Sequence, residues 1–450
     1  MELITLENAG IEFIDGDRGK NYPKIDEFKE QGYCLFLSAK NVTNKGFLFD
    51  EKLFISQEKD GLLRKGKLSR GDIVITTRGT VGNVALYNDI VPFDNIRINS
   101  GMVILRCNQQ KYSTVFLDIV FRSEFFQNQI KGLVSGSAVP QLPIKDLKNL
   151  KMPNLSLENQ KKVIDMVGRL ENKIQLNTQI NQTLEQIAQT IFKSWFIDFD
   201  PVHAKANALA SGQTAEQATQ VAMAVISGKN TQELHRLQTA NPEQYQQLWE
   251  IAEAFPSGFD EEGVPWGWES KPLDEIAIYQ NGLALQKFRP ESEDEYLPIV
   301  KIAQLKQGYA DGKEKASVNI KPECIIDNGD VIFSWSGSLV VDIWCGGKAA
   351  LNQHLFKVTS KNYPKWLYYF YTVHHLAEFQ RIAADKAVTM GHIKREHLSL
   401  ALCVIPNNEF IQKFCFLEDY ISQIVNNRLQ NVSLIKIRDE LLPKLLSGEV

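Results

Sequence analysis

Two long stretches of the chain carry apolar residues at alternating spacings of four and three. This spacing is typical of a helix that packs along another helix, because a repeat of about 3.5 residues keeps one face turned toward the partner. The first series is Val163, Val167, Leu170, Ile174, Asn177, Asn181, Leu184, Ala188, Ile191 and Trp195. The second series is Leu417, Tyr420, Ile424, Asn427, Asn431, Leu434, Arg438, Leu441 and Leu445.

Both series contain asparagines at matching places, Asn177 and Asn181 in the first and Asn427 and Asn431 in the second. A polar residue on an apolar seam costs stability but fixes register and partner. We therefore expect the two helices to pair with each other as an antiparallel coiled coil. The alternative is a coiled coil that merely tolerates asparagines at the edge of its seam. At roughly 1.5 Å per residue, a helix of about 43 residues spans about 60 Å, so the pair would be a rigid spacer.

The segments ahead of the two helices also repeat. Matching strings follow one another in the same order: 35–46 with 297–308, 71–74 with 329–332, 79–80 with 337–338, 144–145 with 393–394, and 153–154 with 406–407. Each copy mixes strand-like stretches (72–77, 102–106, 331–335, 355–359) with helical ones (115–130, 364–382). The fold class expected is α+β, with two α+β domains separated by the two long helices in a pseudo-twofold repeat.

The domain boundaries follow from this repeat and from breaks in composition. A stretch rich in Ala and Gln with helical propensity lies between the halves, and a Pro- and Gly-containing string near residue 265 ends it. We expect a first α+β domain at 1–152, a first spacer helix at 153–200, a helical connector at 201–262, a second α+β domain at 263–405 and a second spacer helix at 406–450.

Composition and charge narrow the class of protein. With 44% hydrophobic and 23% charged residues in 450, the chain is of ordinary globular type. The net charge of −4 is uneven, because residues 201–262 hold three basic against eight acidic side chains and residues 1–150 hold 20 against 18. No apolar run is long enough to span a membrane and the first residues do not resemble a signal peptide, so a cytoplasmic location is expected.

The usual signatures of catalysis are missing from the sequence. It has no phosphate-binding P-loop, no dinucleotide-binding glycine motif and no nucleophile elbow. The six cysteines are scattered without a C-x-x-C pair, and the adjacent His374 and His375 would point apart on a helix. Asp198 and Asp200 are interpreted as residues at a helix end. We expect neither a catalytic nor a metal site.

Loops suited to polar recognition recur instead. After the strand at 72–77 comes Arg78-Gly79-Thr80-Val81-Gly82-Asn83, and its counterpart at 334–338 holds Ser and Trp but no Arg. An arginine fork suits guanine or phosphate. A second loop pair lies at 135–141 and 387–392. Ordinary glycine turns are the alternative for each loop alone, but their recurrence at matched positions favours recognition, with each half reading something different.

At these residues the sequence resembles the specificity (S) subunit of a type I restriction-modification system. The resemblance covers essentially the whole chain and rests on the two-copy layout and on 15–23 (DGDRGKNYP), 158–163 (ENQKKV), 173–177 (KIQLN), 191–201 (IFKSWFIDFDP) and 265–268 (PWGW). It implies a DNA-binding, non-catalytic subunit with two target-recognition domains, each contacting one half of a split asymmetric site on double-stranded DNA. It also implies docking of two methyltransferase subunits on the paired helices, and ATP-dependent restriction subunits as further partners.

On this reading the chain itself binds no cofactor, and S-adenosylmethionine, ATP and Mg belong to the partner subunits. The candidate DNA contacts of the first domain are Arg18, Lys20, Asn21, Arg78, Thr80, Asn83 and Gln141. Those of the second domain are Trp335, Ser336, Ser338, Gln353, His392 and Lys394. Near-neutral recognition domains suggest that partners complete the DNA clamp. Two rivals stay open: a self-contained restriction-methylation enzyme, and a helical scaffold whose α+β domains bind proteins.

Overall fold

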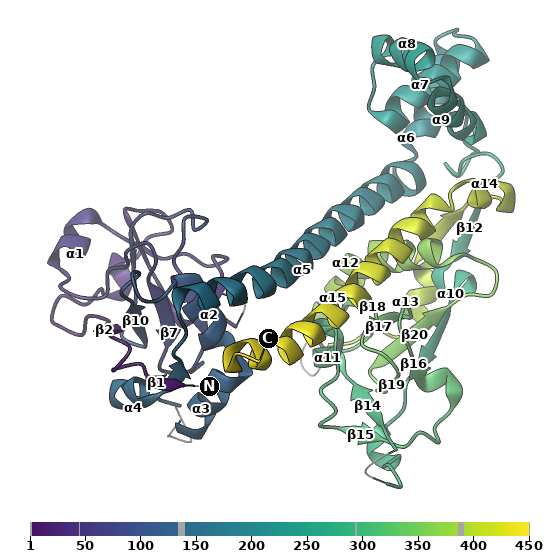
Figure 1. The fold of residues 1–450 in the computed structure, drawn as a ribbon. Helices are drawn as coiled ribbons and strands as arrows, with labels where there is room; N and C mark the ends of the chain where they lie inside the picture. The colour runs from purple at the N-terminus through teal and green to yellow at the C-terminus, as the bar shows by residue number, and fades with distance from the viewer. Residues whose placement is uncertain (1, 45, 134–139, 293–294, 386–390, 450) are drawn as a thin grey trace. The chain divides into compact units, whose positions relative to one another are not determined.

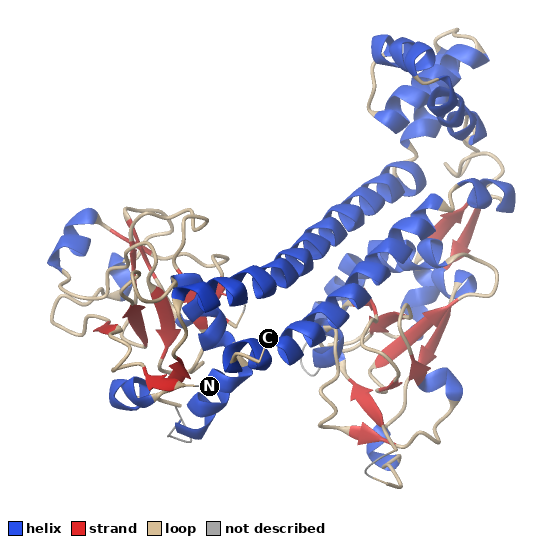
Figure 2. Ribbon diagram, in the orientation of Figure 1, coloured by secondary structure: helices blue, strands red, loops and turns tan. Residues whose placement is uncertain are grey.

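The structure is a computed structural model that describes residues 2–44, 46–133, 140–292, 295–385 and 391–449 (Figure 1). The chain divides into two compact units. The first unit comprises Met1–Gln175 and Asn431–Val450, and the second comprises Leu176–Gln430. Each unit contains one α+β domain together with stretches of both long helices (Figure 2).

The domain of the first unit is built on a four-stranded antiparallel sheet in the order β2-β10-β7-β8. Its strands are β2 (Glu12–Asp15), β10 (Met102–Arg106), β7 (Ile73–Thr76) and β8 (Val84–Leu86). A three-stranded sheet has the order β6 (Phe54–Ile55), β3 (Cys34–Phe36) and β9 (Ile96–Arg97). The remaining elements are β1 (Leu3–Thr5), β4 (Val42–Thr43), β5 (Gly46–Phe47), β11 (Lys151–Pro153), α1 (Gln57–Leu62), α2 (Thr114–Arg122), α3 (Glu124–Leu133) and α4 (Ile144–Asn149).

The four-stranded sheet is buried on both faces, and the period-2 alternation of its strands decides what each face contacts. Ile73, Val103 and Leu105 pack in one core with residues of α2 and α3. Val74 and Ile104 face the other way, into the core shared with β3 and β9. This explains why the strands have runs of consecutive apolar residues, as strands buried on both faces do.

The domain of the second unit repeats this plan. Its four-stranded sheet has the order β13-β20-β17-β18, with β13 (Ile278–Asn281), β20 (Leu355–Thr359), β17 (Val331–Ser334) and β18 (Val341–Ile343). A second sheet has the order β15 (Lys315–Ala316), β14 (Leu297–Val300), β19 (Ala349–Leu351) and β16 (Ile325–Ile326). The other elements are β12 (Glu269–Pro272), β21 (Leu402–Ile405), α10 (Leu273–Ile276), α11 (Ile302–Gln307), α12 (Lys365–Asp385) and α13 (Arg395–Leu400).

These strands and helices confirm the expected α+β class and the internal repeat. The strands expected at 102–106 and 355–359 are β10 and β20 with the same bounds. The single helix expected at 115–130 is instead two helices, α2 and α3, which meet at Ser123. The Ser123 side chain bonds the carbonyl of Val120 and accepts from the N–H of Phe126, which ends one helix and begins the next.

The first long helix, α5 (Leu157–Phe192), has 36 residues and continues as a π-helical turn at Lys193–Ile197. The second is interrupted, unlike the unbroken helix expected at 406–450. A short α14 (Asn408–Lys413) precedes α15 (Phe416–Ser447). The backbone N–H of Phe414 bonds the carbonyl of Ile411 and ends α14, and Phe414 is fully buried. The break between α14 and α15 therefore lies where the side chain of Phe414 enters the core.

The two long helices contact each other through their asparagines. In the second unit, Asn181 donates from Nδ2 to the carbonyl of Ile424 at 3.1 Å, and Asn427 donates to Oδ1 of Asn181 at 2.8 Å. In the first unit, Asn431 donates from Nδ2 to the carbonyl of Ile174 at 3.3 Å. As residue numbers rise along α5 from Ile174 to Asn181, the numbers of their partners on α15 fall from Asn431 to Ile424. The pairing is therefore antiparallel. The expected coiled coil is confirmed. Asparagine side chains on its seam donate to main-chain carbonyls of the opposite helix.

The other positions predicted to pair are turned inward as well. Val163, Leu417 and Ile424 are buried, and the rest of the apolar set is half-buried: Leu170, Ile174, Leu184, Ile191, Leu434 and Leu441. At the ends of the pair the seam merges with the domain cores, because Val163 shares a core with Leu445 in the first unit. The spacer helices are thus part of the domains they carry.

Between the halves, the connector folds into four helices: α6 (Asp200–Ala210), α7 (Ala215–Ser227), α8 (Thr231–Ala240) and α9 (Pro242–Ala254). Lys205 is 7% exposed, and its ammonium donates to the carbonyls of Ala252, Glu253 and Phe255 at 3.3, 3.0 and 2.5 Å. Burial lowers the pKa of Lys205. This lysine caps the end of α9 and ties it to α6.

Replacing the seam asparagine tests the pairing. Asn181→Ala removes the donor to the Ile424 carbonyl and the acceptor of the Asn427 amide, which leaves the amide N–H of the buried Asn427 without this partner. We expect the free energy of unfolding to fall by about 1–3 kcal/mol, measured by urea denaturation of the full chain. Gln182→Ala, on the exposed face of the same helix, is the matched control and should change it little. Equal stability of the two variants would contradict the role given to Asn181.

Candidate functional site

The register of each four-stranded sheet brings several loops to one edge. In the first domain Asp15 at the end of β2 pairs with Val103, and Thr76 at the end of β7 pairs with Met102. Because β10 is antiparallel to both neighbours, the loops that leave β2 and β7 lie beside the turn that enters β10. The second domain has the same register, with Asn281 opposite Phe356.

We call these loops the first and second loop clusters. The first loop cluster comprises residues 16–20, 77–83, 99–101 and 140–142. The second loop cluster comprises residues 282–285, 335–340, 352–354 and 391–394. Residues 135–139 and 387–390 of the second predicted loop pair lie outside the described residues.

In the first loop cluster, the predicted contacts Arg78 and Gln141 are joined by an antiparallel bridge. Main-chain bonds run from Gly79 N–H to Pro140 at 3.2 Å and from Leu142 N–H to the carbonyl of Thr77 at 2.9 Å. Two loops separated by about 60 residues of chain are thus held together at their bases.

The second loop cluster has the same bridge, between Ser336 and His392. Its main-chain bonds run from Gly337 N–H to Gly391 at 2.8 Å and from Ile393 N–H to Trp335 at 3.0 Å. The position-matched loops inferred from the sequence are therefore also matched in their hydrogen bonding. A shared frame carries different side chains in the two domains.

Each cluster also contains a turn, at 99–101 and at 352–354, that the sequence did not predict. The Asn99 side chain accepts from Gly101 N–H at 2.8 Å, and the Asn352 side chain accepts from His354 N–H at 3.2 Å. In each domain the carbonyl of the third turn residue accepts from the first N–H after the neighbouring strand. Gly101 accepts from Thr77, after β7, at 2.8 Å, and His354 accepts from Trp335, after β17, at 3.3 Å. An Asn-x-Gly or Asn-x-His string directly before the matched strands was the signal available in the sequence.

A glycine in each domain makes room for this turn. A Cβ at Gly16 would lie 2.2 Å from the carbonyl oxygen of Asn99, and a Cβ at Gly282 would lie 2.2 Å from that of Leu351. Neither position can hold a side chain without displacing backbone.

In the first loop cluster, Lys20, Arg78, Thr80 and Gln141 are exposed. Across the described part of the chain, no acceptor bonds the Arg78 guanidinium. Arg18 is also exposed but is engaged, since it bonds Asp15 at 3.1 Å and the carbonyl of Ser100 at 3.3 Å.

The two asparagines predicted as DNA contacts of the first domain face the protein. Asn21 donates to the carbonyl of Leu62 at 3.2 Å, and Asn83 donates to that of Val42 at 2.9 Å. Thr80 accepts through its carbonyl from the Thr76 hydroxyl. Arg78, Lys20 and Gln141 are therefore the better placed to reach a ligand, and the asparagines hold the loops.

In the second loop cluster, Trp335 is half-buried and its indole N–H donates to the carbonyl of Gln353 at 3.1 Å. The His392 ring lies edge-on to this indole at a centroid distance of 6.3 Å. Ser336 is only 3% exposed, and its Oγ lies 2.9 Å from Nδ1 of His354.

The remaining candidates of this cluster are bonded, and Ser338 and Lys394 are exposed. Ser338 accepts from the Lys306 ammonium at 2.6 Å, and Lys394 forms an ion pair with Glu396 at 3.2 Å. Gln353 is half-buried, and its amide lies 3.3 Å from Nε2 of His354. His354, which the sequence did not single out, contacts both Ser336 and Gln353.

Titratable groups away from the clusters are arranged for packing. Burial raises the pKa of the Cys34 thiol to about 12, and burial, with His374 beside it, lowers the pKa of His375 to about 4. A protonated thiol is a poor nucleophile and a neutral, buried imidazole carries no charge. Within the described ranges, no group of three His, Cys, Asp or Glu side chains is placed to hold a metal ion. Among the helices described, none combines the length and the hydropathy of a membrane-spanning segment.

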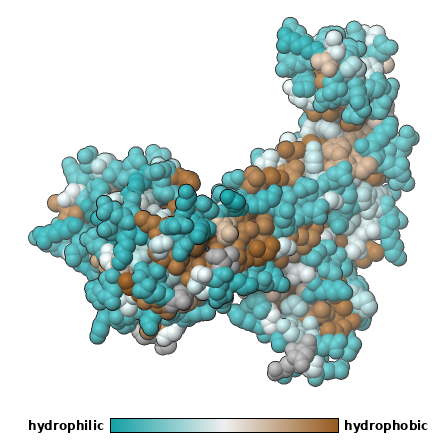
Figure 3. Space-filling model, viewed as in Figure 1, coloured by the Kyte–Doolittle hydropathy of each residue, from teal (hydrophilic) through white to brown (hydrophobic). Residues whose placement is uncertain are grey.

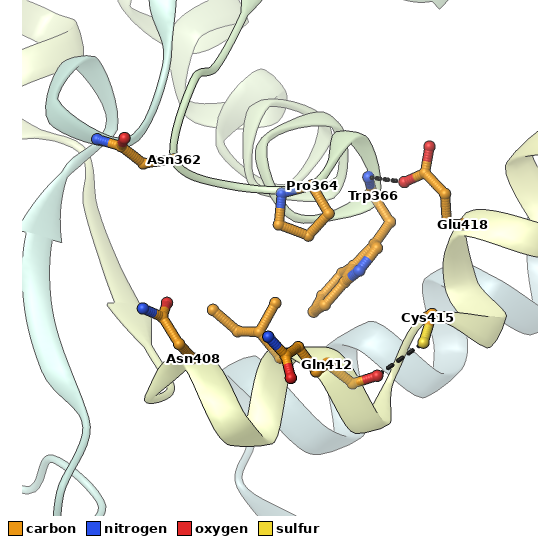
Figure 4. A pocket seen from close by; sticks show the side chains of 8 residues that line it. Asn362, Pro364, Trp366, Asn408, Gln412, Cys415 and Glu418 are labelled. Carbon is orange, nitrogen blue, oxygen red and sulfur yellow. Dashed lines mark hydrogen bonds between the residues drawn. The ribbon is translucent and has the colours of Figure 1, made fainter.

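A pocket of about 470 Å³ lies elsewhere in the second unit, between the start of α12, α14 and the start of α15 (Figure 4). Pro364, Trp366 and Ile411 form its apolar wall, and Asn408 and the exposed Gln412 lie along α14. Glu418 accepts from the backbone N–H of Trp366 at 3.1 Å. None of its lining residues belongs to the second loop cluster.

The long helices carry a further surface feature. Large apolar side chains stand exposed on α5 in the second unit (Leu176, Ile180 and Ile187) and on α15 in the first unit (Val432, Ile435 and Ile437). Apolar atoms are visible along α5 in Figure 3. The pairing of the helices leaves these side chains uncovered within each unit.

Comparison with known proteins gives a consistent picture. The family described as "Type I restriction modification DNA specificity domain" matches residues 12–186 and 265–433, one stretch for each α+β domain with most of the long helix that follows. The HindI type I restriction enzyme specificity subunit of Haemophilus influenzae is 29% identical over 98% of this chain and 99% of its own length. The MjaIX specificity subunit of Methanocaldococcus jannaschii is 24% identical over 91% and 86%. Among solved structures, a type I S subunit from M. genitalium is 11% identical with a TM-score of 0.47, covering 99% of this chain and 95% of that one.

Proposed function

Because the chain belongs to the type I restriction-modification DNA specificity family, we propose that its two loop clusters each read one half of a bipartite, asymmetric DNA site. The chain is the DNA-recognition subunit of such a system and not its enzyme. The observation that carries the proposal is the frame shared by both clusters: the same bridge and the same asparagine turn hold the exposed Arg78 in one domain and the buried Ser336 at the matching position of the other. A common frame with different side chains is what an asymmetric two-part site requires.

The chemistry of the exposed side chains suits the grooves of DNA. The Arg78 guanidinium can donate two parallel hydrogen bonds to O6 and N7 of guanine. Lys20 suits a backbone phosphate, since an ammonium binds phosphate as a point charge. The first domain therefore supplies a base reader and a positioning contact on neighbouring loops.

The paired helices are suited to set the distance between the half-sites. In the second unit the domain is fastened to both long helices, because Arg428 of α15 bonds Asp342 at 2.7 Å and Tyr369 bonds Glu185 of α5 at 3.3 Å. In the first unit the side chain of Gln160, at the start of α5, accepts from the N–H of Ser113, which precedes α2, at 2.8 Å. On this proposal, the length of the paired helices sets the spacing of the half-sites.

Partners are part of the proposal. The first domain is close to neutral in charge, while phosphate neutralisation dominates DNA affinity, so other subunits are expected to close around the duplex. We assign the exposed apolar side chains of the long helices to the docking of two methyltransferase subunits. S-adenosylmethionine would be bound by those subunits, and ATP and Mg by restriction subunits that join them.

Arg78→Ala tests base reading. If Arg78 contacts a guanine, we expect the variant to lose about 1–3 kcal/mol of binding free energy and to tolerate other bases at one position of one half-site. Genome-wide mapping of methylated sites in the host strain would show this relaxation. Arg169→Ala removes the same charge from the exposed face of α5 and should leave the recognised sequence unchanged. An unaltered sequence in the Arg78 variant would contradict the assignment.

Ile187→Glu and Ile437→Glu test the docking surface. Each replaces an exposed isoleucine with a carboxylate, since Ile187 is 41% and Ile437 50% exposed. The chain should therefore fold as before, but burying the new charge against a partner costs free energy. We expect methyltransferase subunits to stop co-purifying with the double variant. Gln189→Glu on the exposed face of α5 is the matched control, and co-purification retained by the double variant would refute the surface.

A further inference from the structure

Three side chains of the second loop cluster form a continuous row. The Gln353 amide nitrogen lies 3.3 Å from Nε2 of His354, and Nδ1 of the same ring lies 2.9 Å from Oγ of Ser336. The row runs from the half-buried Gln353 to the buried Ser336. It links residues from two of the loops that the sheet register brings together.

The backbone N–H and carbonyl groups of Gln353 and His354 are all hydrogen-bonded. The Gln353 N–H donates to Leu283 at 2.9 Å, and the Gln353 carbonyl accepts from the Trp335 indole at 3.1 Å. The His354 N–H donates to the Asn352 side chain at 3.2 Å, and its carbonyl accepts from the Trp335 N–H at 3.3 Å. With its main chain fixed, Gln353 has only side-chain freedom to lose on binding a ligand.

The imidazole removes much of that remaining freedom. An amide nitrogen can only donate, so Nε2 of His354 must accept, and the ring proton then sits on Nδ1 and is donated to Ser336 Oγ. One N–H of the Gln353 amide is thereby used. Its second N–H and its Oε1 remain for another partner and lie in one plane.

That pair of groups matches one base. A glutamine reads adenine by donating to N7 and accepting from the N6 amino group in the major groove. Resting on the proposed DNA-reading function, we propose that Gln353 reads an A·T pair in the half-site of the second domain and that His354 is the positioning residue that orients its amide through Ser336.

The first domain supplies a natural contrast. Its turn has the same asparagine and the same hydrogen bond from the N–H two residues later, but Ser100 and Gly101 stand where Gln353 and His354 stand in the second. Neither can present a long planar amide, and Arg78 is the exposed fork of that cluster. The two turns thus share a backbone and differ in the base chemistry they offer.

The test is a set of chromosomal variants in the host strain, each followed by genome-wide mapping of the methylated sites. Gln353→Glu should change the preferred pair at one position from A·T to C·G, because a carboxylate accepts from the cytosine amino group. Gln353→Ala should lower discrimination at that position about 10- to 100-fold. Every position of the other half-site serves as an internal control and should be unchanged.

Two substitutions separate the two contacts of His354. His354→Gln keeps an acceptor at the place of Nε2 and should retain the A·T preference. His354→Asn keeps a polar group only at the place of Nδ1, so it should relax the same position as Gln353→Ala. Rescue by glutamine but not by asparagine distinguishes positioning of Gln353 from simple packing of the ring.

The inference is overturned if Gln353→Glu and Gln353→Ala leave the recognised sequence unaltered, or if their effects fall in the half-site that Arg78→Ala changes. It is also overturned if Gln353→Glu, present at wild-type levels, supports no methylation at all. Failure of the proposed function would look different, since the wild-type strain and a strain lacking this chain would then share the same methylated sites.

Discussion

The pairing of the two long helices depends on one kind of interaction. It is the hydrogen bond between a seam asparagine and a main-chain carbonyl on the opposite helix. A given carbonyl lies at one fixed position along its helix and an asparagine side chain is short, so the hydrogen bond forms only when the two helices are aligned at one axial position. Asn181 and Asn431 make this contact with Ile424 and Ile174, residues that correspond to each other in the two repeats. The two helices are therefore locked in one register, where apolar side chains alone would allow sliding by a heptad.

Each domain separates the groups that build its loops from the groups that are free to contact a ligand. Gly16 and Asn99 belong to the first kind, because backbone approaches closely at one and a turn closes on the other. Arg78 belongs to the second kind, since it is exposed and without an acceptor in the described part of the chain. This division lets one fold support different readings in its two copies, since the frame does not depend on the reader.

The sequence predicted the parts of the structure that rest on periodicity. The seam from Val163 to Leu445, the strands at 102–106 and 355–359 and the paired loops all follow from spacings that local geometry enforces. It did not predict His354, whose contact with Ser336 depends on how two strands are paired. Nor did it predict the break at Phe414, because an aromatic residue in a helical pattern does not show which core it will enter. The DNA contacts chosen from sequence divide in the same way: Arg78 is exposed, but Asn83 is committed to Val42.

Lys205 affects the electrostatics of the connector. It is one of only three basic side chains among residues 201–262, and its charge is enclosed among the carbonyls at the end of α9. The connector's outer surface is therefore more acidic than its composition suggests. A polyanion such as DNA is repelled by such a surface within about 8 Å at physiological salt, so the connector disfavours nonspecific adsorption of DNA to itself.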